Sequence, residues 1–102
     1  MKAKVGTVGR GVLTDEIKVL SERVLGYEIT QAELRLMPYI QYVMMNEQKL
    51  KIEHINAEER KILSYWRKRG FIEGGASGLS MTKIFWDAIN QILWLGYVAY
   101  ND

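Results

Sequence analysis

Basic side chains gather on one face of the helix predicted for Ala57 to Arg69. At about 100° per residue, this face carries Arg60, Lys61, Arg67 and Lys68, with Ser64 among them. Ile62, Leu63 and Trp66 point to the opposite side. Cations at this spacing could contact the phosphates of a nucleic acid. The alternative is an ordinary charged helix face in water.

Aromatic and methionine side chains form a second candidate site, for a protein partner. Trp94 falls on the polar side of the last predicted helix, between Lys83 and Asp87. An exposed tryptophan is typical of an interface anchor; alternatively, the second helix or the N-terminal arm covers it. The stretch Tyr39 to Met45 is either a flexible part of the core or a groove for a partner helix. The candidate interface comprises Trp94, Trp86, Tyr39, Tyr42 and Met45.

No group of residues in the sequence has the spacing of a catalytic or metal site. His54 is the only histidine, and its neighbours Glu53, Glu58 and Glu59 lie across a predicted helix start. There is no cysteine, and the glycines at positions 6, 9 and 11 match neither a Rossmann nor a Walker pattern. We therefore expect no catalytic, cofactor-binding or metal-binding residues, no small-molecule substrate and no enzymatic activity.

The composition is that of one globular domain, comprising residues 1–102. Hydrophobic residues make up 48% and charged residues 25% of the 102 positions. The net charge is only +2, but acidic residues dominate Thr14 to Glu33 whereas basic residues dominate Ala57 to Arg69. The lack of cysteine, of a signal peptide and of a membrane-spanning stretch favours a cytoplasmic protein without membrane contact. Residues 1–12 are predicted to form a flexible arm or a short strand.

Capping residues mark the starts and ends of the helices. Thr14 precedes a helix that ends at Leu25, before Gly26. Two capping boxes, Thr30 with Glu33 and Asn56 with Glu59, start further helices. Pro38 falls inside the first of these and predicts a kink, or a break that starts a separate helix. Gly70 followed by Phe71 predicts a Schellman motif at the end of the Asn56 helix.

The last predicted helix, Met81 to Leu95, is apolar over roughly 200° of its circumference. We expect the rest of the chain or a second copy to enclose it, with Phe85, Ile89 and Ile92 out of water. Residues 73–80 are predicted to be a glycine-rich loop with Ser80 as the helix cap. The sequence Leu95-Gly96-Tyr97 predicts a second glycine stop.

These elements predict a mainly α fold, a compact bundle of four or five helices. At most a minor strand pair is expected, drawn from Lys49–Glu53, Tyr27–Thr30 or Tyr97–Tyr100. The last helix is placed at the centre. Its predicted neighbours in the core are Ile17, Leu20, Val24, Leu34, Ile40, Val43, Ile62, Leu63 and Trp66.

A helix, a turn and a helix that closes on Leu95-Gly96-Tyr97-Val98 resemble the core of a winged helix-turn-helix domain. The resemblance implies a nucleic-acid-binding regulator. The chain departs from the pattern because the intervening loop is long and few residues follow Val98. Its second helix offers Lys83, Asp87, Asn90 and Gln91, a single cation beside an acid, which argues against sequence-specific readout.

The string from Gly70 to Leu79, followed by Phe85-Trp86-Asp87, is similar to small uncharacterised phage and prophage proteins. This resemblance implies a bacterial or viral cytoplasmic accessory protein and assigns no site. Our first hypothesis is therefore a non-enzymatic protein-interaction module that binds a protein partner or forms a homodimer. The alternative is a helix-turn-helix-like regulator that holds nucleic acid through the basic helix.

Overall fold

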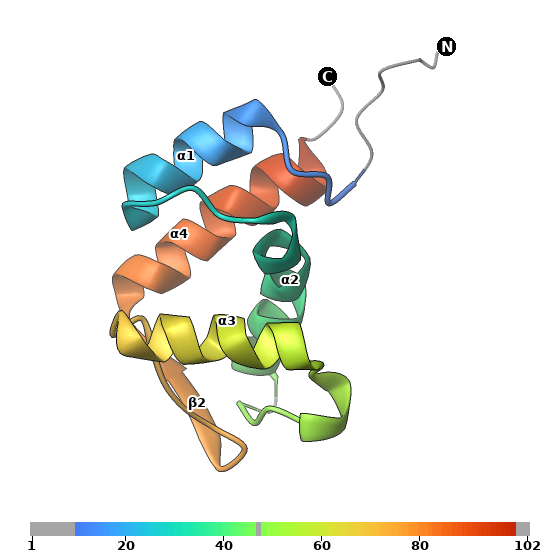
Figure 1. Cartoon of the computed structure of the whole chain (residues 1–102), viewed down its shortest axis with the longest axis vertical. Helices are drawn as coiled ribbons and strands as arrows, with labels where there is room; N and C mark the ends of the chain where they lie inside the picture. Colours follow the sequence, from blue (N-terminus) through green and yellow to red (C-terminus); the bar gives the residue numbers. More distant parts are fainter. Residues whose placement is uncertain (1–9, 47, 100–102) are drawn as a thin grey trace.

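The computed structural model describes residues 10–46 and 48–99 of the chain (Figure 1). Four α-helices and one antiparallel hairpin form within these residues, which confirms the mainly α fold with a minor strand pair. The helices are α1 (Asp15–Leu25), α2 (Gln31–Met45), α3 (Ala57–Lys68) and α4 (Lys83–Leu93). The strands are β1 (Ile72–Gly75) and β2 (Gly78–Met81). A 3-10 turn, η1 (Ile52–His54), precedes α3, and a π-helical turn, η2 (Trp94–Val98), extends α4.

The predicted caps of α1, α2 and α3 are confirmed. The Thr14 hydroxyl accepts a hydrogen bond from the Ile17 amide, and Gly26 ends α1 with a φ of 86°. Both capping boxes form, at the starts of α2 and α3. At the end of α3, the amide of Phe71 donates to the Trp66 carbonyl at 2.9 Å, as a Schellman motif requires. These local signals therefore set most of the helix boundaries.

Pro38 does not divide α2, so the prediction of a separate helix is wrong. The helix continues from Gln31 to Met45 with Pro38 inside it. Leu34 and Met37 before this position and Ile40 and Val43 after it are all buried in the same core. Packing on both sides of the proline offsets the hydrogen bond that its missing N–H removes.

The prediction of a loop at residues 73–80 is wrong, because these residues belong to the hairpin. Ile72 pairs with Met81 and Gly75 with Gly78. Glycine is required at Gly74, where φ is 78° and an added Cβ would collide with the carbonyl oxygen of Gly78. Buried Ile72 and Leu79 anchor the two strands to the core. The cap of α4 is consequently Thr82, whereas Ser80 lies in β2.

None of the three segments expected to supply strands does so within the described residues. Residues 27–30 form the connection between α1 and α2, and Tyr97 lies in η2. The segment before η1 comes nearest to the expectation, since it lies alongside the tip of the hairpin. The Leu50 amide donates to the Gly75 carbonyl at 3.0 Å, and the Leu79 amide donates to the Gln48 carbonyl at 2.6 Å.

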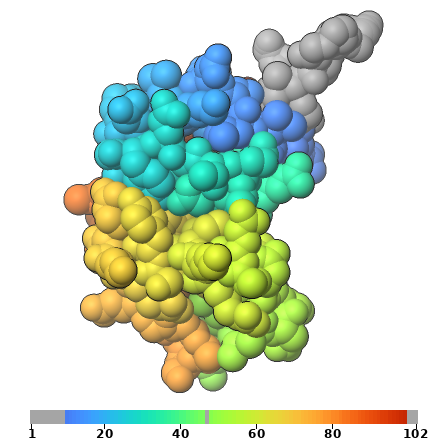
Figure 2. All heavy atoms as spheres, viewed as in Figure 1, coloured from blue at the N-terminus to red at the C-terminus, as the bar shows by residue number. Residues whose placement is uncertain are grey.

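Helix α4 lies at the centre of the molecule, as predicted. It packs against α1 and α2, and Phe85, Ile89 and Ile92 are fully buried. In the space-filling view, the blue-green and yellow parts of the chain hide most of α4 (Figure 2). A second copy is therefore not needed to cover this arc. On the same helix, Ile84 stays 72% exposed.

The chain does not stop at Gly96 with a left-handed residue, so the predicted second glycine stop is wrong. Instead the helix widens into η2, where the Ala99 amide donates to the Trp94 carbonyl at 2.7 Å. Gly96 is buried, and an added Cβ would lie 3.3 Å from the Leu34 Cδ1 atom. Its small size lets the turn approach α2 closely.

The part of the N-terminal segment that the structure describes is bound to the body of the protein. The Gly11 amide donates to the Gly96 carbonyl at 2.7 Å. The Gln31 side chain donates to the Gly11 carbonyl and accepts from the Leu13 amide. Residues 10–12 are thus neither an arm nor a strand, and residues 1–9 of the predicted arm lie outside the described residues. Among the described helices, none has the length and apolar character to cross a bilayer.

Candidate protein-interaction site

Trp94 stands at the surface where α4 passes into η2. Its side chain is 58% exposed, so neither α2 nor the described part of the N-terminal segment covers it. Its two polar neighbours on the helix, Lys83 and Asp87, form an ion pair at 2.8 Å. Single-turn π-helices are often found at functional sites, and here one begins at the exposed tryptophan.

Two surface depressions flank the Trp94 side chain, one on each side. The α2-side depression, with a volume of about 310 Å³, is lined by Pro38, Gln41, Leu93, Tyr97 and Val98. The α1-side depression, with a volume of about 550 Å³, is lined by Glu16, Leu20, Arg23, Gln91 and Leu95. Asn90 and Trp94 border both. We call Trp94 and these two depressions the Trp94 face.

The Trp94 face has a fixed floor. The Gln41 side-chain amide donates to the Asn90 Oδ1 atom at 2.7 Å, which joins α2 to α4 within the lining of the α2-side depression. The Asn90 amide in turn donates to the Trp86 carbonyl at 2.8 Å. A depression held by such bonds is largely formed before a partner arrives, which lowers the entropic cost of binding.

Two of the predicted interface residues, Tyr42 and Met45, continue this surface along α2. Tyr42 and Met45 follow Pro38 and Gln41 at spacings of four residues, so all four share one face of α2. Tyr42 and Met45 are both exposed. Trp86 is partly buried on α4, two turns before Leu93. Tyr39 is not part of the Trp94 face, because its hydroxyl accepts a hydrogen bond from the Lys51 amide at 3.1 Å.

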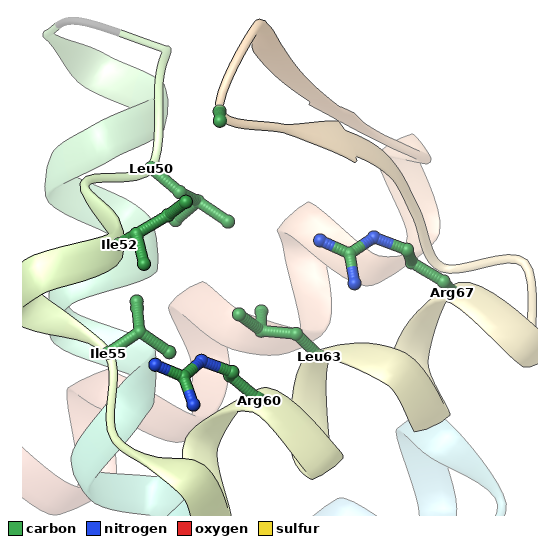
Figure 3. Close-up of a pocket in the computed structure, with 7 residues that line it drawn as sticks. Leu50, Ile52, Ile55, Arg60, Leu63 and Arg67 are labelled. Carbon is green, nitrogen blue, oxygen red and sulfur yellow. The ribbon is translucent and has the colours of Figure 1, made fainter.

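The four basic residues predicted to contact nucleic acid are all exposed on α3, but they do not act as one set. Arg60 and Arg67 flank a different depression, of about 290 Å³, together with Leu50, Ile52, Ile55, Leu63 and Ala76 (Figure 3). We call it the arginine depression. Lys61 and Lys68 do not line it. Among the described residues, no carboxylate forms an ion pair with any of the four.

A cluster of buried polar side chains lies beneath α3. Its composition resembles that of a catalytic site, but its hydrogen bonds stabilise the fold. Glu33 is buried, and its Oε2 atom accepts from the Tyr27 hydroxyl at 2.5 Å and from the Trp66 Nε1 atom at 3.2 Å. Its Oε1 atom accepts from the Thr30 amide at 2.8 Å, which completes the capping box. Burial, and then the bond to Glu33, raise the pKa of Tyr27 far above its usual range. These hydrogen bonds join α2, the connection between α1 and α2, and α3.

His54 lies at the surface, near Tyr39. It is exposed, and its ring meets the ring of Tyr39 edge-on with centroids 6.0 Å apart. No group of three histidine, cysteine, aspartate or glutamate residues that could hold a metal ion occurs in the described part of the chain.

Comparison of the chain with models of protein families, with curated proteins and with solved structures gives no match. The resemblances to winged helix-turn-helix domains and to phage proteins therefore stay predictions.

The sequence indicated some residues of the Trp94 face and of the arginine depression, but not the residues that surround them. The polar neighbours of Trp94 made exposure one of two alternatives, and helix periodicity placed Arg60 and Arg67 on one face. The apolar lining at Leu50, Ile52 and Ile55 was missed, because these residues reach α3 only through the tertiary fold. The opposite charges at Glu16 and Arg23, beside Trp94, were missed for the same reason.

Proposed function

We propose that this chain is a non-enzymatic protein-interaction module that pairs with a second copy of itself through the Trp94 face. The observation that carries the proposal is the exposed indole between two depressions on a preformed surface. Tryptophan is among the residues that contribute most when an interface buries them. Each depression has room for an aromatic ring, since a cavity of about 150 Å³ accepts benzene.

The charges of the α1-side depression favour a second copy as the partner. Glu16 and Arg23 are seven residues apart on α1, and no ion pair joins either of them to another described residue. In a two-fold symmetric pair, each contact occurs twice with the roles exchanged. Two antiparallel α1 helices would set Glu16 of one copy against Arg23 of the other. Val19, exposed between these two positions, would be covered at the same time.

The first test is the solution mass as a function of protein concentration, measured by sedimentation equilibrium. We expect the mass to rise from one chain towards two, and Trp94→Ala to remain a monomer over the same range. Ile84→Ala is the matched control, since Ile84 is a still more exposed apolar residue of the same helix, outside the Trp94 face. A monomeric wild-type chain at all concentrations would refute the proposal, as would equal losses in the two variants.

A charge exchange tests the symmetric arrangement. Arg23→Glu and Glu16→Arg should each weaken pairing, because each sets like charges against one another. The double variant should recover most of the wild-type association constant, since it restores both opposite-charge contacts. If the double variant is weaker than either single one, the antiparallel pairing of α1 is wrong.

A second candidate function is nucleic-acid binding through α3. It is supported by the exposure of Arg60, Lys61, Arg67 and Lys68 and by the lack of ion-pair partners for them among the described residues. This function requires duplex binding that weakens steeply with salt. Replacing all four residues by glutamine should abolish it, measured by the fluorescence anisotropy of a labelled duplex. Unchanged affinity in that variant would exclude this function for α3.

A further inference from the structure

The arginine depression lies apart from the Trp94 face. It opens between α3, the tip of the β1–β2 hairpin and the segment that leads into η1, whereas Trp94 follows the far end of α4 (Figures 1 and 3). No residue lines both surfaces. A ligand in the arginine depression would thus leave the Trp94 face free.

The floor of this depression is apolar and fixed. Leu50, Ile55 and Leu63 are core residues whose remaining exposed surface is small. Ile52 stands beside them and is 62% exposed, although it is a large aliphatic side chain. The volume of about 290 Å³ is enough for one bulky apolar side chain with space for neighbouring backbone. Such an open apolar recess favours an apolar occupant.

The rim of the depression is cationic at two points. Arg60 and Arg67 are seven residues apart, which is roughly 10 Å along a helix. In Figure 3 the Leu63 side chain lies between the two guanidinium groups. The Arg67 Nε atom donates to the Gly74 carbonyl at 3.0 Å, so this side chain is held against the hairpin. Its remaining N–H groups and those of Arg60 have no carboxylate partner among the described residues.

We propose that the arginine depression binds an acidic peptide segment, which inserts one bulky apolar side chain between Arg60 and Arg67 and places carboxylates against both guanidinium groups. Arginine forms forked, charge-assisted hydrogen bonds with carboxylates. The apolar floor and the two cations therefore match different parts of the same ligand. The segment belongs to another protein, and the proposal does not depend on pairing through the Trp94 face.

A nucleic acid fits this depression less well. Phosphates would satisfy the two guanidinium groups but leave the aliphatic floor without a partner. Bases of single strands bind by stacking on aromatic side chains, and the residues that line the depression include none. The apolar floor is therefore the observation that distinguishes a peptide from a phosphate backbone.

The test measures binding of a labelled synthetic peptide to the full chain by fluorescence anisotropy. The probe is a capped pentapeptide with a central leucine and two glutamates on each side. One comparison peptide replaces the leucine by serine, another replaces the glutamates by lysines, and a labelled DNA duplex is the third probe. We expect only the acidic leucine peptide to bind measurably at concentrations up to about 1 mM.

Variants locate the binding site. Arg60→Gln should weaken peptide binding at least about tenfold, as expected for loss of a charge-assisted contact. Ala76→Phe should abolish it, because Ala76 lies in the exposed turn of the hairpin and a ring there would fill the depression. The matched control is Lys68→Gln, which removes one positive charge from α3 outside the depression and should change affinity less than about threefold. Circular dichroism verifies that each variant is folded.

Four results would overturn the proposal. These are equal binding of the serine peptide, equal losses in Arg60→Gln and Lys68→Gln, tighter binding of the duplex than of the peptide, and no peptide binding at all. The first would show that charge alone attracts the ligand, and the third would favour the nucleic-acid function of α3. None of them depends on whether Trp94 mediates self-association.

Discussion

Two tryptophans of this chain have opposite environments. Trp66 has no exposed surface, its Nε1 atom donates to both Tyr27 and Glu33, and its ring meets the ring of Phe85 at 5.0 Å. Trp94 is 58% exposed and forms no hydrogen bond through its side chain with the other described residues. The same residue type thus stabilises the fold in one place and leaves apolar surface available in the other. Stability and association should therefore respond to different substitutions.

The largest expected effect is the loss of Trp66. Trp66→Ala should lower the free energy of unfolding by about 3–5 kcal/mol, because it leaves a cavity and removes a hydrogen-bond donor from Glu33 and Tyr27. Trp94→Ala should change it by less than about 0.5 kcal/mol. Urea unfolding followed by circular dichroism measures both.

These measurements need protein dilute enough to be monomeric, because self-association would add to the apparent stability of the wild-type chain. If Trp94→Ala destabilises the dilute chain as much as Trp66→Ala does, Trp94 is part of the core of the fold. The distinction between the two tryptophans would then be lost.

The next largest effect concerns the buried carboxylate that Trp66 contacts. Glu33→Gln should cost about 1–3 kcal/mol, because the new NH₂ group must face either the Thr30 amide or the Trp66 Nε1–H group, neither of which can accept a hydrogen bond. Either orientation opposes a donor to a donor in a buried site. The free energy of unfolding at neutral pH measures the effect.

Glu59→Gln is the matched control. Glu59 completes the capping box of α3 in the same way as Glu33 does for α2, but its side chain is only partly buried and its hydrogen bond to the Asn56 amide is exposed. Water can compensate there, so we expect a loss of less than about 1 kcal/mol. Similar losses in both variants would mean that the cap, and not the buried cluster, explains the role of Glu33.

The two tryptophans also show what the sequence could and could not predict. Helix caps at Thr14, Thr30 and Asn56 depend on residues within one turn, so their signals are local and were predicted correctly. The burial of Trp66 followed from helix periodicity, whereas periodicity placed Trp94 on the polar side of its helix but left open whether another segment covers it. The hairpin was missed because its glycines are equally typical of a loop, and only the burial of Ile72 and Leu79 distinguishes the two.

The candidate sites could be predicted less completely than the fold. The Trp94 face combines residues of α1, α2, α4 and η2, and the arginine depression combines α3 with the hairpin turn and residues 50–55. No spacing in the sequence indicates that Ile52 and Ala76 face the same space. Contacts between elements depend on how helices pack, and this information is absent from any single helix pattern.

The smallest expected effect is a decline of stability at alkaline pH, which depends on the cluster around Trp66 and not on Trp94. Burial raises the pKa of Tyr27 in the folded chain. Above pH ~10 the unfolded chain releases this proton while the folded chain retains it, so the free energy of unfolding falls as pH rises. Below that pH the tyrosine is neutral in both states and contributes no pH dependence. The slope should be smaller than the ~1.4 kcal/mol per pH unit of one fully retained proton, because solvent reaches part of the ring.

Tyr27→Phe tests this assignment, since it removes the titrating hydroxyl and should make the alkaline decline shallower than in the wild-type chain. Tyr42→Phe is the control, because Tyr42 is exposed on α2 and the same substitution there should leave the decline unchanged. Burial also raises the pKa of Tyr97, so some decline should persist in Tyr27→Phe. An identical slope in the wild-type chain and Tyr27→Phe would show that deprotonation of the Trp66 cluster does not drive the loss. The decline of stability at alkaline pH would then depend neither on the Trp66 cluster nor on Trp94.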